Sequence, residues 1–102
     1  MRRGTTPTHT FGWNEPISVS DIKIVKVTYA QGGKVILEKR TKDCTLTEGK
    51  ISVRLTQEET MLFKDNEKVK IQGRIVTNDK SSYVSDVLVC YAKELLDDEV
   101  LM

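Results

Sequence analysis

The sequence predicts an all-β fold: an antiparallel, immunoglobulin-like β-sandwich of about seven strands with one short helix. Three observations support this fold class. Valine, isoleucine and threonine are frequent and alternate with polar residues, as they do in strands with one buried face. Turn-forming clusters recur roughly every ten residues, which is the spacing of a sandwich. Only residues 57–64 carry a helix signature. A small β-barrel is the alternative.

The chain is short enough that we expect a single domain. It has 102 residues and a mass of 11.6 kDa. We divide it into an N-terminal arm at 1–7, a sandwich domain at 8–92 and an acidic C-terminal tail at 93–102. Hydrophobic residues make up 38% and charged residues 30%, which excludes a disordered chain. The sequence shows neither an apolar run of membrane-spanning length nor a signal peptide, so we expect no membrane partner and a reducing compartment.

The first strand is predicted over residues 8–13, between two prolines that cannot donate to a sheet, Pro7 and Pro16. One face of this strand carries His9, Phe11 and Trp13. A short turn at 18–21 leads to the next strand.

A hairpin is predicted over residues 22–40, with its turn at Gln31-Gly32-Gly33. A two-residue loop would place Glu38 on the apolar face, opposite Val27. A three-residue loop gives the pairs Tyr29–Val35, Val27–Leu37 and Lys26–Glu38, which join apolar residues inside and opposite charges outside. We therefore predict the three-residue loop, with Gly33 in the left-handed conformation.

The middle of the chain predicts two strands and the helix. Strands at 44–47 and 51–56 flank the turn Glu48-Gly49-Lys50. Thr56 and Glu59 have the spacing of a capping box, which opens a helix of about two turns. We expect Met61, Leu62 and Phe63 to pack from this helix against one end of the core.

Two long strands complete the predicted sandwich. In the strand at 68–76, the inward residues are Val69, Ile71, Gly73 and Ile75, and the outward ones are Lys68, Lys70, Gln72 and Arg74. The last strand, at 82–91, is apolar on both faces near its end, which predicts a central strand or one covered by a partner.

No catalytic residue, metal site or cofactor is expected, so we predict that the chain is not an enzyme. His9 is the only histidine, and metal-ligand spacings of histidine and cysteine do not occur. Cys44 and Cys90 lie on different predicted strands, and the expected reducing compartment favours free thiols over a disulfide. The lysines at 68 and 70 lie opposite most of the aromatic residues, so we expect no nucleic-acid partner.

The distribution of charge indicates contacts between copies of the chain. The formal net charge is +1, but residues 1–42 hold eight basic and three acidic residues, whereas residues 43–102 hold eight and twelve. A basic first end and an acidic last end attract each other across neighbouring copies. The predicted interaction residues are Arg2, Arg3, Asp97, Asp98 and Glu99.

Three stretches together resemble small proteins encoded in phages and prophages of Gram-positive, Firmicutes-type bacteria. They are Arg-Arg-Gly-Thr-Thr-Pro-Thr at 2–8, Leu-Thr-Gln-Glu-Glu-Thr at 55–60 and Val-Lys-Ile-Gln-Gly-Arg-Ile at 69–75. The order of features, from residue 2 to about residue 100, is similar to the N-terminal domain of phage baseplate upper proteins, a β-sandwich-like module used in tail assembly. The chain departs from those proteins because it carries no long fibre or receptor-binding region.

This resemblance implies a non-enzymatic structural module of a virion, in the tail or baseplate or in the head or neck. Such a module is made in the bacterial host cytoplasm and binds other virion proteins and its own copies. The resemblance implies no catalytic residue. The alternative is a sandwich that recognises carbohydrate on a host surface, for which Trp13 and Tyr83 would have to be exposed.

Overall fold

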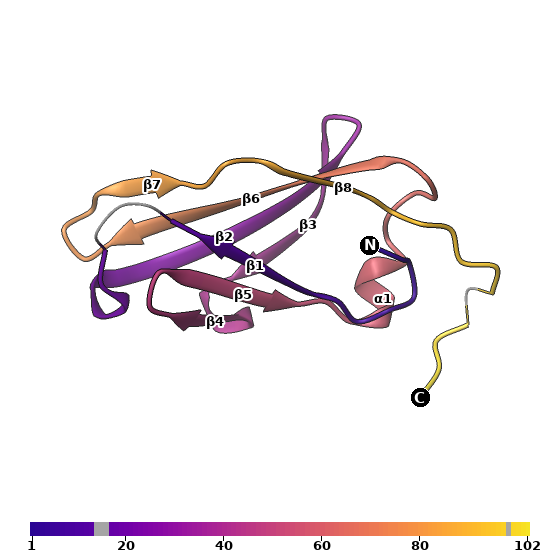
Figure 1. Ribbon diagram of the computed structural model, residues 1–102, viewed down its shortest axis with the longest axis horizontal. Helices are drawn as coiled ribbons and strands as arrows, with labels where there is room; N and C mark the ends of the chain where they lie inside the picture. The colour runs from indigo at the N-terminus through magenta and orange to yellow at the C-terminus, as the bar shows by residue number, and fades with distance from the viewer. Residues whose placement is uncertain (14–16, 98) are drawn as a thin grey trace.

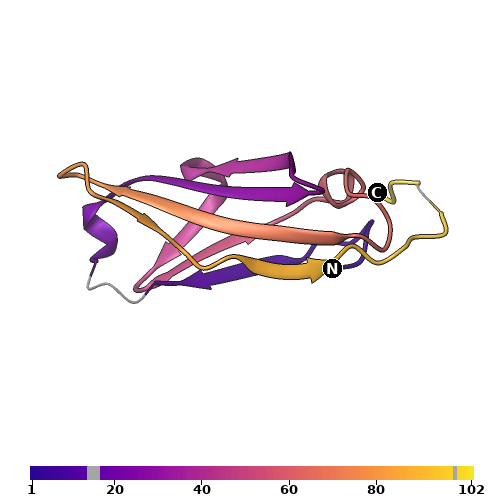
Figure 2. The same ribbon diagram turned by 90° about the horizontal axis from the view of Figure 1, so that it is seen from above.

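The computed structural model describes residues 1–13, 17–97 and 99–102, and these form a mostly β protein with two antiparallel sheets. One sheet has three strands and the other has five (Figure 1). The sheets form two layers, and in the view from above the strands of one sheet cross in front of those of the other (Figure 2). The described strands do not close into a barrel. The predicted two-sheet architecture is therefore confirmed, and the barrel alternative is wrong.

The three-stranded sheet has the order β1-β5-β4, with β1 at Thr8–Gly12, β5 at Lys50–Arg54 and β4 at Cys44–Thr47. His9, Val53 and Cys44 stand opposite one another in one row across this sheet. Because Val53 is buried, this row faces the second sheet. The turn between β4 and β5 has Gly49 at φ +77°, as a tight hairpin requires.

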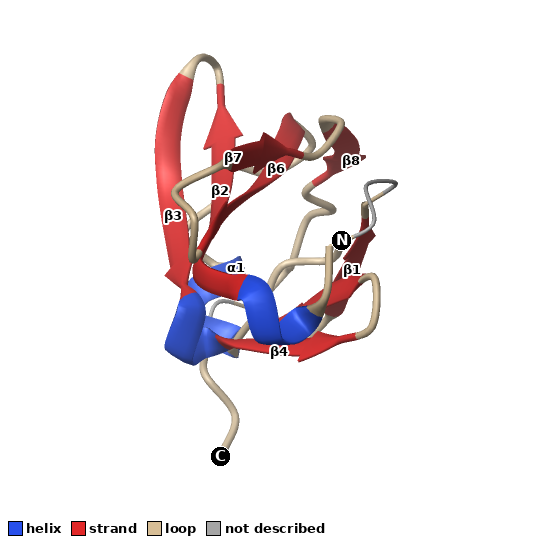
Figure 3. Ribbon diagram, turned by 90° about the vertical axis from the view of Figure 1, so that its left-hand side faces the viewer, coloured by secondary structure: helices blue, strands red, loops and turns tan. Residues whose placement is uncertain are grey.

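The five-stranded sheet is built around two long central strands. These are β2 at Ile22–Gln31 and β6 at Lys68–Thr77. β3 at Lys34–Arg40 flanks β2, and both β7 at Ser82–Val84 and β8 at Leu88–Tyr91 pair with β6. Two single-turn 3-10 helices, at Val19–Asp21 and Thr41–Asp43, precede β2 and β4. Figure 3 shows the five-stranded sheet above the three-stranded one.

The last predicted strand, at 82–91, is neither continuous nor central, so of its two predicted arrangements only coverage by a partner stays a prediction. It forms two short strands, β7 and β8, at the edge of the sheet. The break lies at Ser85, whose Oγ accepts a hydrogen bond from the Gly73 N–H at 2.9 Å and whose own N–H donates to the Gly73 carbonyl at 2.8 Å. A Cβ at Gly73 would lie 3.7 Å from that Oγ, which is an ordinary van der Waals contact.

The β2–β3 hairpin differs from its predicted register. Its loop is the two-residue Gly32-Gly33, with both φ angles positive at +57° and +76°, so the left-handed Gly33 is confirmed but the three-residue loop is wrong. A β-bulge after Tyr29 then shifts the register, so that Tyr29 stands opposite Leu37 and Val27 opposite Lys39.

This bulge explains how a lysine comes to lie on the inner face. Lys39 is only 8% exposed, and its Nζ lies 2.5 Å from Oε2 of Glu59. A buried charge requires such a partner. Lys26 and Glu38 are diagonal rather than opposite, yet their ion pair forms at 3.3 Å.

The predicted capping box is confirmed at the start of helix α1 (Gln57–Thr60). The Glu59 N–H donates to Oγ1 of Thr56 at 3.2 Å, and the Thr56 N–H donates to Oε1 of Glu59 at 2.9 Å. The helix is shorter than predicted: the Leu62 N–H donates to the Glu59 carbonyl, three residues back, at 3.1 Å, and the Lys64 N–H donates to the Gln31 side chain at 2.8 Å. Phe63 is buried as expected, but Leu62 is 56% exposed.

The core lies between the two sheets and follows the predicted alternation. All four predicted inward residues of β6 are buried, and its lysines point outward. Tyr29 and Phe63 form the centre of the core, with ring centroids 5.9 Å apart. The largest fully buried side chains, in order of volume, are Tyr29, Phe63, Ile51, Leu55, Val25, Val27, Val53, Val69 and Thr60.

Candidate interaction surface

The first residues of the chain lie beside the segment that follows β8. Residues 1–3 run parallel to residues 91–93, with a bridge between Arg2 and Lys93. The Lys93 N–H donates to the Met1 carbonyl at 2.7 Å, and the Arg3 N–H donates to the Lys93 carbonyl at 3.1 Å. Further along, the Leu55 N–H donates to the Pro7 carbonyl at 3.0 Å. The segment predicted as an N-terminal arm thus crosses from one sheet to the other within the domain.

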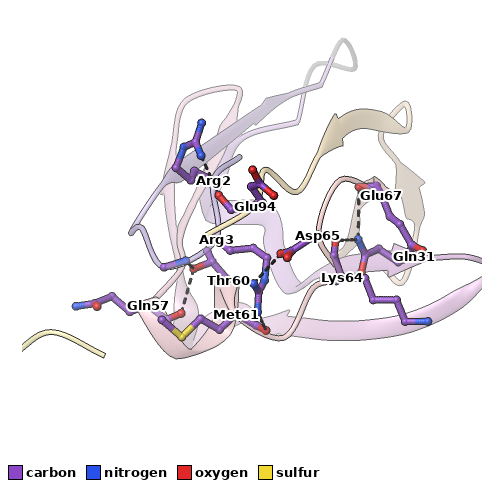
Figure 4. A network of polar contacts seen from close by, with 11 residues as sticks. Arg2, Arg3, Gln31, Gln57, Thr60, Met61, Lys64, Asp65, Glu67 and Glu94 are labelled. Carbon is purple, nitrogen blue, oxygen red and sulfur yellow. Dashed lines mark hydrogen bonds and ion pairs between the residues drawn. The ribbon is translucent and has the colours of Figure 1, made fainter. Parts of the chain in front are cut away.

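Arg3 is held inside this crossing by groups of its own chain. Its guanidinium donates to Oδ1 of Asp65 at 2.6 Å and to the Met61 carbonyl at 3.0 Å (Figure 4). The Arg3 side chain is only 12% exposed. The Arg2 guanidinium lies on the surface, where it donates a hydrogen bond to the Glu94 carbonyl at 2.8 Å. The structure therefore turns the guanidinium of Arg3 toward its own domain.

The acidic tail leaves the domain on the side opposite the five-stranded sheet. Asp97 and Glu99 are exposed, and Asp98 lies outside the described residues. Leu101 is held by Gln57 through two hydrogen bonds, at 2.6 and 2.9 Å. The structure does not bring Asp97 or Glu99 together with Arg2 or Arg3 among the contacts of the described residues.

The polar groups between the sheets form a structural pair. The Tyr29 hydroxyl and Nδ1 of His9 are 2.8 Å apart, and burial lowers the pKa of His9, with the N-terminal ammonium acting in the same direction. Burial also raises the pKa of Tyr29, and the nearby Cys90, Cys44 and Glu59 reinforce that shift. A neutral imidazole that accepts from a protonated phenol fits these directions.

The two thiols are free and poor nucleophiles. Burial raises the pKa of both Cys44 and Cys90, and Asp43 adds to the rise at Cys44. The reactive form of cysteine is the thiolate, which a raised pKa suppresses. Among the described residues, no three histidine, cysteine or acidic groups are placed to hold a metal ion, and no helix could cross a membrane.

Trp13 and Tyr83 come together, but the space between them is small. Both line a hollow between β1 and β7, and Trp13 packs against the core. The hollow has a volume of about 10 Å³, barely the room of one water molecule. Both side chains are half-buried, whereas the carbohydrate alternative requires them to be exposed.

The structure brings basic and apolar side chains together on the outer side of β6 and of the edge strands β7 and β8. Lys68 stands opposite Tyr91, Lys70 opposite Val89 and Arg74 opposite Val84. The side chains of these six residues point to the outer side of the sheet, away from the core, and we call this group the basic face. The three apolar members are 54% (Val84), 54% (Val89) and 50% (Tyr91) exposed. The sequence patterns indicated the two parts of the basic face separately: the outward lysines of one strand, and the last strand that is apolar on both faces.

One end of the basic face is hollowed next to the β2–β3 turn. A depression of about 480 Å³ is lined by Lys68, Lys70, Glu67 and the turn residues Gly32 and Gly33, with Ala30 as its remaining wall. Within the described part of the chain, Lys68, Lys70 and Arg74 form no ion pair. The face therefore presents three uncompensated positive charges beside exposed apolar side chains.

Comparison of the chain with models of known protein families, with curated proteins and with solved structures finds no significant match.

Proposed function

We propose that this chain is a non-enzymatic structural module of a phage particle, in the tail or baseplate or in the head or neck. It acts through protein–protein contacts with other virion proteins and with its own copies. The observation that carries the proposal is the apolar edge, the row of exposed side chains along residues 84–91: Val84, Val87, Leu88, Val89 and Tyr91. The placement in a particle follows from the resemblance of residues 2–8, 55–60 and 69–75 to phage-encoded proteins.

The apolar edge has the properties of an interface. Its five side chains expose roughly 400 Å² of apolar surface in total, divided between the two faces of the edge. Leu88 stands opposite the buried Ile71, whereas Val89 and Tyr91 stand opposite the outward Lys70 and Lys68. They follow an outer strand, and natural proteins normally protect such strands with charge or a covering element. Burying this area would yield about 10 kcal/mol, the same order as the cost of association. A partner that covers the edge and makes a few polar contacts therefore binds stably.

Purified particles test this function directly. In a host that assembles the particles, we would replace the gene with a version encoding a detectable tag, and separate particles from free protein on a density gradient. We expect the chain to sediment with the particles at a constant copy number. Finding the chain only in the free fraction would refute the proposal.

A double variant tests the role of the edge. Val89→Ser with Tyr91→Ser removes its apolar centre, and we expect incorporation to fall about tenfold or more, because two large apolar contacts are lost. Val35→Ser is the matched control, since Val35 is 51% exposed on β3 at the opposite edge of the same sheet. Incorporation of both variants at the level of the unmodified chain would show that the edge is not the contact surface.

A further inference from the structure

The basic face lacks a partner of its own chain. Lys26 and Arg40, which share the outer side of this sheet, are both paired with Glu38, at 3.3 and 3.2 Å. Lys68, Lys70 and Arg74 have no such pairing among the described residues. A ligand that matches the face must therefore supply negative charge together with apolar side chains.

The C-terminal segment has this composition. Residues 94–102 hold four acidic residues and no basic one. Among the described residues, Glu94, Asp97 and Glu99 are exposed, and Leu96 and Leu101 are 95% and 68% exposed. The segment thus offers carboxylates interleaved with leucines, opposite in charge to the basic face and alike in apolar content.

We propose that the basic face of one copy binds the acidic C-terminal segment, residues 94–101, of a second copy. This inference rests on the proposed function and names the partner surface for self-assembly. Lys68 and Lys70 are two residues apart on β6, and Asp97 and Glu99 are two residues apart in the segment. In the structure the Glu99 N–H donates to Oδ1 of Asp97 at 3.0 Å, and the contact with a second copy requires this hydrogen bond to open so that the segment is extended. In extended chains both spacings are about 6.6 Å. The two carboxylates can therefore meet the two ammonium groups in register, with Leu101 of the segment continuing along the exposed apolar residues.

The segment of a given copy is directed away from its own basic face. Leu101 is hydrogen-bonded to Gln57 at the start of α1. Val100 and Met102 border a hollow with Arg54 and Leu55, at the end of the three-stranded sheet. Figure 3 shows the C-terminus below this sheet, whereas the five-stranded sheet lies above it. Contact between segment and face thus joins two copies.

This contact is head-to-tail, because it joins two different surfaces. After one such contact, one copy keeps an unused face and the other keeps an unused segment. Such contacts propagate into a ring if the rotation between copies closes, or into a filament if it does not. The expected assembly is therefore a closed ring, of which a pair that exchanges segments is the smallest, or a filament.

Charge reversal tests this inference. The face variant carries Lys68→Glu, Lys70→Glu and Arg74→Glu, and the tail variant carries Glu94→Lys, Asp97→Lys and Glu99→Lys. We expect the unmodified chain to show a mass by light scattering that rises with concentration and falls with salt. Each variant alone should associate at least about tenfold more weakly than the unmodified chain. An equal mixture of the two variants should recover association, because each face then meets a segment of opposite charge.

Two controls keep the test specific. Lys42→Glu, Lys50→Glu and Lys80→Glu together change the net charge as much as the face variant does, but at exposed positions on other surfaces. This control should associate like the unmodified chain. Urea midpoints of all variants report folding, and we expect them to agree because every substituted side chain is exposed.

The outcomes separate this inference from the proposed function. If the unmodified chain is monomeric at every concentration and salt level but still sediments with particles, the face–segment contact is wrong and the function stands. If the mixture fails to recover association, the contact is also wrong. Binding of a thymidine oligonucleotide that the face variant loses, with no self-association, would replace the contact with a nucleic-acid site.

Discussion

Arg3→Ala provides a sharp test of whether the N-terminal charge acts within the chain or between chains. In the structure, the Arg3 guanidinium donates to Asp65 at 2.6 Å and to the Met61 carbonyl at 3.0 Å. An intramolecular role predicts that its removal lowers the free energy of unfolding. An intermolecular role predicts that its removal lowers self-association and leaves unfolding unchanged.

The expected loss can be worked out from the surroundings of Arg3. The hydrogen bond to the Met61 carbonyl has a charged donor and contributes about 1.5–2 kcal/mol. The Asp65 side chain is 43% exposed, which limits that ion pair to about 1 kcal/mol. Together they predict a loss of about 2–3 kcal/mol. In a domain of this size, the melting temperature then falls by roughly 10–20 °C.

The assay is urea unfolding followed by far-UV circular dichroism, with light scattering on the same samples. Arg2→Ala is the matched control: its guanidinium makes one exposed hydrogen bond, at 2.8 Å to the Glu94 carbonyl, so we expect a loss below about 1 kcal/mol. Arg3→Lys should fall between the two, because an ammonium cannot reproduce the fork of a guanidinium. An Arg3→Ala chain that unfolds within about 0.5 kcal/mol of the unmodified one would refute this reasoning.

Three further predictions concern residues that hold the domain together. Gly4→Ala should lower the unfolding free energy by about 1–2 kcal/mol in urea titrations, because Gly4 has φ +78°, a left-handed conformation that a Cβ strains, whereas Cδ2 of Leu95, 2.5 Å from the new methyl group, is the end of a side chain that can move aside. Tyr29→Phe should cost about 1–2 kcal/mol by the same titration, since it leaves His9 without its 2.8 Å partner; an unchanged midpoint would show that the pair is not stabilising. Because the pKa of His9 lies below its ordinary 6.5 in the folded chain, the neutral form favours folding. The contribution of neutral His9 to the free energy of unfolding should therefore be fully present above pH 6.5 and be lost as the pH falls below it. Urea titrations at each pH should show that His9→Gln makes this decline smaller.

The alternation of residues predicted most of the fold, because each buried face repeats with a period of two. The inward set of β6 and the capping box at Thr56 both came from local spacing alone. The hairpin register did not, because it depends on a bulge after Tyr29. That bulge places Lys39 inside, where the carboxylate of Glu59 receives it at 2.5 Å. Nothing near Lys39 in the sequence indicates a partner twenty residues away.

The candidate surface was only partly visible in the sequence for a related reason. A strand that is apolar on both faces is typical both of a central strand and of an edge strand that a partner covers. The choice between them rests on Ser85, which bonds to Gly73 on β6 and divides the segment into β7 and β8. Pairing with β6 from one side only leaves Val84, Val89 and Tyr91 exposed.

The charge asymmetry of the sequence takes a different meaning once the strands are paired. Several basic residues of the first part are neutralised within the fold: Arg3 pairs with Asp65, Lys39 with Glu59, and Lys26 shares Glu38 with Arg40. The uncompensated cations instead lie on β6, in the acidic part of the sequence, because alternation gathers Lys68, Lys70 and Arg74 on one side of a strand. The distribution of charge along the chain therefore predicts attraction between copies, but it assigns the basic partner surface to the N-terminus instead of to β6. The surface to mutate is a sheet face, and substitutions at the N-terminus should report on folding instead.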